Sequence, residues 1–164
     1  MIAFILALAL QVAPATPAGE EAVAPYVASD ANAGATPFVG DAMWRAFHKQ
    51  AGIDRIVDTM VARNIADPRI GDIFKGQDLV RLRRVLKEQF CYILGGGCHY
   101  SGRAMREAHT DMGVQDADMG ALVENLQAAM RREGVSFAAQ NRLLAKLAPM
   151  HRDIVKVWGK HPAN

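Results

Sequence analysis

The stretch from Gly95 to His109 reads GGGCHYSGRAMREAH. Consecutive glycines disfavour a helix and allow the left-handed backbone of a sharp turn, so we expect a preceding helix to end here. Residues 103–110 are long enough for two helical turns, on which Met105 and His109 share one face. Taken alone, such a histidine is more often a surface or core residue than a metal ligand.

Apolar residues recur at three- and four-residue steps on both sides of this stretch, which is the period of an amphipathic helix. Upstream, the pattern predicts one helix over residues 53–65, ending before Asp67-Pro68, and a second over residues 79–93. Downstream, it predicts helices over residues 122–130 and 137–154, the latter capped by Ser136. Because no stretch alternates like a strand, we predict one all-α domain over residues 41–164.

The composition limits the classes of function. With 164 residues, 51% of them hydrophobic, and a formal net charge of +2, the chain fits one soluble domain. A nucleic-acid binder would carry a clustered basic stripe, so we expect no nucleic-acid partner. The local basic cluster indicates first a solvated helix face, with an anion site as the alternative; it comprises Arg81, Arg83, Arg84 and Lys87.

The usual signatures of metal and enzyme sites are missing from the sequence. None of the five histidines pairs with another histidine or a cysteine at the spacing of a zinc site on one helix. Cys91 and Cys98 form neither a CxxC pair nor a CxxCH haem-attachment motif. Since a nucleophile elbow and a phosphate-binding loop are also lacking, we predict no catalytic residue.

The segment Tyr100–His109, directly after Gly95-Gly96-Gly97, resembles the proximal region of truncated haemoglobins. The usual sequence pattern of that family in this region is Gly-Gly, then Tyr-Thr-Gly-Arg, then Met, then Ala-His. The resemblance extends back through residues 66–70 and Ile73-Phe74-Lys75-Gly76, and forward to residues 147–149 and 153–155. It covers about residues 44–156, and the glycine bends place the chain with group I.

The resemblance implies a two-over-two helical sandwich around haem b. By it, His109 is the proximal iron ligand, with His99 as the next candidate, and a neutral imidazole suits that role. The other residues that it places at the haem are Val61, Phe74, Leu82, Leu86, Phe90 and Met105.

The same resemblance implies reversible binding of O2, CO or NO, and a reductase of unknown identity. NO-oxidising or peroxidase-like turnover is a secondary expectation. The alternative, from another class of function, is a globin fold that has lost haem and serves as an interaction or sensor module.

The distal side departs from the family pattern. Val61 stands where group I members carry a tyrosine, Leu86 where they carry a glutamine, and Leu82 at the usual distal gate. Losing a buried donor worth about 1.5–3 kcal/mol speeds the escape of O2 by roughly one to two decades, which favours fast exchange, redox work or sensing over storage. Gln89, where the family usually has phenylalanine, is either a substitute donor or a helix-surface glutamine.

Two further positions bear on the comparison with the family. Phe90 falls where the family keeps a phenylalanine along its ligand tunnel. Gln50-Ala51-Gly52 replaces the family's first Gly-Gly motif.

The amino-terminal residues of the sequence predict that the protein is exported from the cytoplasm. The apolar run Ile2–Leu10 is too short to span a bilayer but suits a signal peptide, and small residues at 13–15 and 18–19 offer cleavage points. We expect a signal peptide over residues 1–18, a periplasmic or exported protein, and no membrane span after cleavage. Because Lys and Arg are lacking before the run, the alternative is a misassigned start codon and a cytoplasmic protein.

Residues 19–40 are rich in Ala, Pro and Gly without sustained periodicity, which predicts a disordered lead-in. Between Cys91 and Cys98 the chain must reverse, so their side chains can meet. In an oxidising compartment they would be allowed to form a disulfide. The alternative is two separate thiols, with Cys91 buried as a small hydrophobe.

Overall fold

The computed structural model describes residues 16–155, and every regular element within this range is a helix. The long helices are α2 (Lys49–Ala66), α3 (Leu79–Ile93), α5 (Asp116–Arg132) and α6 (Phe137–Leu147). The short helices are α1 (Ala42–Ala46), α4 (Met105–Ala108) and α7 (His151–Ile154). Three single turns of 3-10 helix complete the fold: η1 (Asp30–Ala33), η2 (Gly71–Phe74) and η3 (Ala148–Met150). The all-α prediction is confirmed.

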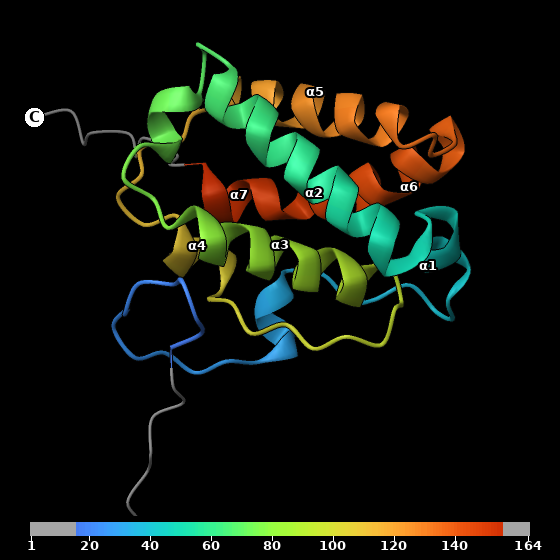
Figure 1. Cartoon of the computed structure of the whole chain (residues 1–164), viewed down its shortest axis with the longest axis horizontal. Coiled ribbons are helices and arrows are strands. Elements are labelled where there is room, and N and C mark those ends of the chain that lie inside the picture. Colours follow the sequence, from blue (N-terminus) through green and yellow to red (C-terminus); the bar gives the residue numbers. More distant parts are fainter. Residues whose placement is uncertain (1–15, 156–164) are drawn as a thin grey trace, which may run out of the picture.

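Helix α2 is the centre of the architecture. It crosses the molecule diagonally and makes its most extensive contacts with α5 and α3, while α6 and α7 lie behind it (Figure 1). Its buried face carries the predicted apolar stripe, including Ile53, Val57 and Val61. The helix ends at Asp67 because Pro68 disfavours helical backbone in the residue before it.

Local signals set the ends of the other long helices. The Asp78 carboxylate accepts a hydrogen bond from the backbone N–H of Arg81 at 2.9 Å and so caps the start of α3. The Ser136 hydroxyl accepts one from Ala139 N–H at 3.3 Å, which confirms the predicted start of α6. Helix α3 ends before Gly95, where φ is +84° and an added Cβ would lie 2.1 Å from the carbonyl oxygen of Gly40. Only glycine allows that close approach.

Gln50-Ala51-Gly52, the stretch that replaces the family's first Gly-Gly motif, lies inside α2. The left-handed backbone lies just before them, at His48 with φ 59° and Lys49 with φ 60°. Gly52 is required for another reason, since an added Cβ would come within 2.1 Å of the carbonyl oxygen of Phe47.

The prediction of a disordered lead-in over residues 19–40 is wrong. The segment runs along α3, where it forms η1 and hydrogen bonds with distant parts of the chain (Figure 1). Composition misses this order because the contacts are mostly to backbone atoms and single charges, not to a periodic apolar face. The predicted signal peptide, residues 1–18, lies almost entirely outside the described residues. Among the described helices none is long and apolar enough to cross a membrane.

The basic cluster on α3 is neither an open solvated face nor an anion site. Arg81 and Arg84 both pair with the carboxylate of Glu20 in the lead-in. Arg83 and Lys87 reach Asp58 on α2, at 3.5 and 3.0 Å. Arg81 also contacts Asp78, and Arg84 contacts Glu88, so four carboxylates of the chain lie beside the four cations.

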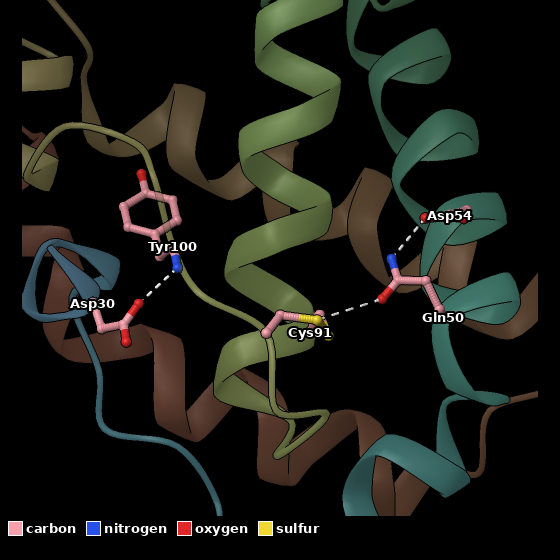
Figure 2. Close-up of a disulfide and its surroundings, with 6 residues drawn as sticks. Asp30, Gln50, Asp54, Cys91 and Tyr100 are labelled. Carbon is pink, nitrogen blue, oxygen red and sulfur yellow. Dashed lines mark hydrogen bonds between the residues drawn. A yellow bond between two sulfur atoms is a disulfide. The ribbon is translucent and has the colours of Figure 1, made fainter. Parts of the chain in front are cut away.

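Cys91 and Cys98 form a disulfide, with their Cα atoms 5.7 Å apart, so the first of the two alternatives is confirmed. Cys91 is buried at the end of α3, and Cys98 follows the triple glycine. On the α2 side of the bridge, Gln50 hydrogen-bonds Asp54 at 2.8 Å (Figure 2). The bridge ties both ends of the glycine bend together.

Candidate functional site

His109 lies at the carboxyl end of α4, half-buried. Its Nδ1 is 2.7 Å from the carbonyl oxygen of Met105, one turn earlier in the same helix. A carbonyl oxygen can only accept, so this contact selects the neutral tautomer with its proton on Nδ1 and its lone pair on Nε2. An imidazole fixed in this way presents Nε2 as a ready metal ligand.

The other described histidines are held by carboxylates. His99 is 91% exposed, and its Nδ1 lies 2.9 Å from Asp30 Oδ2. His48 contacts Glu133, and the Nε2 of His151 is 2.7 Å from Asp116. Among the described histidines, His109 therefore stands apart, because its ring is oriented by a backbone carbonyl and not by a charged partner.

The structure brings most of the expected haem-lining residues into one apolar region. Val61 and Phe90 are buried in the core, at 0% and 3% exposure. Leu82, Leu86 and Met105 are half-buried and pack against the same core. Their partly open apolar surfaces offer an area that a flat apolar group can cover.

Phe74 lies outside this cluster, whereas His109 is connected to it through its own helix. Phe74, in η2, is half-buried and is not among the apolar side chains that pack against the core. His109 follows Met105 by one turn, so its helix joins the cluster through Met105.

The motif residues around Tyr100 have a structural role. Tyr100 is 5% exposed, and its hydroxyl donates to the carbonyl oxygen of Arg103 at 3.1 Å. Burial raises the pKa of Tyr100 to about 12, so the phenol stays protonated and remains a donor. Gly102 makes room for the ring, since an added Cβ would lie 2.2 Å from the Tyr100 hydroxyl. This packing holds the turn that leads into α4.

Gln89 is neither a surface glutamine nor a free distal donor, so both sequence interpretations are wrong. It is 5% exposed, and its Nε2 donates to the carbonyl oxygen of Ala33 at 2.8 Å. The same Nε2 lies 3.6 Å from the sulfur of Met105 and 3.9 Å from that of Met150. The sequence could not reveal this role, because the acceptor is a backbone atom of the lead-in.

Sequence reasoning also missed Asn64. It lies on the buried face of α2 one turn after Val61 and is 1% exposed. Its Oδ1 has no hydrogen-bond partner among the described residues. A polar residue inside an apolar helical stripe was the signal that could have singled it out.

The donor set fits haem better than a metal ion held by protein ligands alone. A protein-bound ion needs several side-chain ligands, and no group of three or more His, Cys, Asp or Glu residues in the described part of the chain could hold one. A haem iron needs one imidazole from the protein, together with apolar walls. His109 and the cluster that includes Leu82 and Leu86 supply these.

Comparison with known proteins agrees with this geometry. The model of the bacterial-like globin family matches residues 43–156. A group 1 truncated haemoglobin of Tetrahymena thermophila is 32% identical over 87 residues, which cover 53% of this chain and 72% of that protein. The group 1 truncated haemoglobin GlbN of a Synechocystis species is 33% identical over 87 residues, covering 51% and 70%.

Solved structures show the same fold. The Fe(III) form of the truncated haemoglobin from Tetrahymena pyriformis superposes with a TM-score of 0.66 at 26% identity, covering 69% of this chain and 97% of that one. The 2/2 haemoglobin of a Synechococcus species, at 24% identity and a TM-score of 0.65, shares the fold. The family match spans nearly the whole described domain after the lead-in. The chain therefore belongs to the bacterial-like globin family, within the group 1 truncated haemoglobins.

Proposed function

We propose that this globin binds haem b with Nε2 of His109 as the protein ligand to the iron. The observation that carries the proposal is the 2.7 Å hydrogen bond from His109 Nδ1 to the Met105 carbonyl oxygen, which in the neutral ring directs the lone pair to Nε2. Bound haem supplies an iron atom at which diatomic gases bind reversibly. The chain's own part is to orient the imidazole, to cover the haem with apolar side chains and to exclude water.

The distal residues favour ligands that need no hydrogen bond. Val61, Leu82 and Leu86 offer no donor, and the amide of Gln89 is engaged by Ala33. Bound O2 carries partial negative charge, whereas CO and NO depend less on a donor. We therefore propose rapid exchange of O2 and a role in redox chemistry or gas sensing, with a separate reductase returning the iron to its ferrous state.

A spectrum of the purified protein tests the haem site. The wild-type protein should show a Soret band that shifts when CO is added. His109→Ala should lose haem, or should show the spectrum of imidazole-ligated haem only when free imidazole is added. His99→Ala is the matched control, because His99 is exposed and pairs with Asp30, and it should leave the spectrum unchanged. A normal histidine-ligated spectrum in His109→Ala would show that another residue holds the iron.

We also propose that the protein is exported, with cleavage after Ala15 or Ala18. The Cys91–Cys98 disulfide supports an oxidising compartment, where such bridges persist. Amino-terminal sequencing of the native protein tests this. A mature chain that begins near Thr16 or Gly19 is expected, and an intact Met1 in a cytoplasmic fraction would contradict export.

A further inference from the structure

The segment Glu20–Gly34, here called the strap, lies before the residues that match the globin family, which begin at Met43. It is nevertheless built into the domain. In Figure 1 it runs in blue below α3 and includes η1, which packs on that helix. Its contacts fall into three groups: with the start of α3, with the stretch before α4, and with Gln89 of α3 and Met105 of α4 together.

The first group fastens the strap to the amino-terminal half of α3. The carboxylate of Glu20, almost fully buried, binds Arg84 with an Oε2–Nη2 distance of 2.9 Å and approaches Arg81 at 3.4 Å. The backbone N–H of Glu21 donates to Asp78 at 2.8 Å, and Arg81 donates back to the Glu21 carbonyl oxygen at 2.7 Å. Hydrogen bonds to charged groups are stronger than neutral ones, so this end is firmly held.

The second group fastens the strap to residues 99–103, which lead into α4. The backbone N–H of Tyr100 donates to Asp30 Oδ1 at 2.7 Å (Figure 2), and His99 contacts the other oxygen of the same carboxylate. The hydrogen bond from Tyr100, followed by that from His99, holds the pKa of Asp30 below its usual range. The Tyr26 hydroxyl donates to the Ser101 carbonyl oxygen at 2.7 Å.

The third group lies where the two helices meet. Ala33 is fully buried, and its carbonyl oxygen accepts from Gln89 of α3. Gly34, with φ +80°, is so closely packed that an added Cβ would lie 3.1 Å from the Met105 side chain and 3.0 Å from that of Met150. Met105 is also the residue whose carbonyl oxygen orients His109. The strap therefore touches the distal helix and the helix of the proximal histidine at one place.

We propose that the strap is an additional wall of the haem pocket, which holds α3 and α4 at a fixed separation and thereby slows the loss of haem. This inference rests on the proposed function, because it takes α3 and His109 to lie on opposite faces of the haem. Asp30 and Gln89 are positioning residues in this arrangement. Each joins the strap to one of the two sides, and neither is assigned a contact with the iron.

The rate of haem transfer from the full-length, haem-loaded protein to an excess of apomyoglobin tests the proposal. Asp30→Ala and Gln89→Leu should each speed haem loss by roughly tenfold or more, because each leaves a buried or charged partner without its hydrogen bond. Asp41→Ala is the matched control. It removes an exposed ion pair with Arg45 in α1, outside the strap, and should leave the rate unchanged.

A second measurement separates positioning from general stability. Because haem stabilises the whole folded domain, the comparison is between regions: haem should slow hydrogen exchange in residues 20–34 more than in α1, which lies outside the strap. The proposal would be overturned if haem slowed hydrogen exchange in residues 20–34 no more than in α1, or if both strap variants lost haem at the wild-type rate. Haem binding itself would still be supported by the Soret band of the wild-type protein. A wild-type protein that takes up no haem would instead overturn the proposed function and, with it, the strap's role.

Discussion

Reduction of the Cys91–Cys98 disulfide should destabilise the domain by an amount that follows from the short loop it closes. The two cysteines lie seven positions apart in the sequence. For a closed loop of about eight residues, the chain-entropy relation gives roughly 2.5 kcal/mol at 25 °C. Reduction removes no packing atoms, and the Cys91 thiol can stay buried as a small apolar group. The free energy of unfolding should therefore fall by about this loop term.

Urea unfolding of the wild-type protein, with and without dithiothreitol, measures this change in unfolding free energy. With an ordinary denaturant dependence for a domain of this size, the midpoint should fall by roughly 1–2 M urea. Cys98→Ala provides the control, because it already lacks the bridge and its midpoint should not respond to the reductant. Equal midpoints for oxidised and reduced wild-type protein, with both thiols shown to be free by labelling, would refute the reasoning.

Three further predictions follow from individual residues. The Arg55 hydrogen bond lowers the pKa of Glu133 to about 2, so the Glu133 carboxylate stabilises the fold above pH 4.5, and this contribution is lost as the pH falls towards 2. Glu133→Gln should therefore lower the unfolding free energy by about 1–2 kcal/mol at pH 7. A difference between Glu133→Gln and wild type that stays constant in acid would contradict this. Lys49→Gly should raise the thermal midpoint because it relieves left-handed strain of about 1 kcal/mol, whereas Lys49→Val should lower it. Val61→Tyr should slow O2 dissociation at least about tenfold in stopped-flow measurements by adding a donor, and an already slow wild-type rate would mean that another donor exists.

The regular part of this globin was predictable from local sequence. The long helices were expected from three- and four-residue periodicity, and Ser136 and Pro68 marked ends that the structure confirms. The stretch 137–154, predicted as one helix, instead divides into α6, η3 and α7. Caps, glycines and prolines act within about one helical turn, so their effects are visible in a short window of sequence. The Tyr100–His109 motif likewise indicated the candidate site, because all of its members lie in one continuous segment.

The tertiary structure alone revealed the strap and the partner of Gln89. The residues that meet there are 56 positions apart, and the acceptor is the carbonyl oxygen of Ala33. Every residue carries such an oxygen, so the side-chain pattern holds no sign of which one will be used. The order of residues 20–34 depends on the same kind of contact, made to backbone atoms and single charges that are distant in the sequence and are neighbours only in the folded domain.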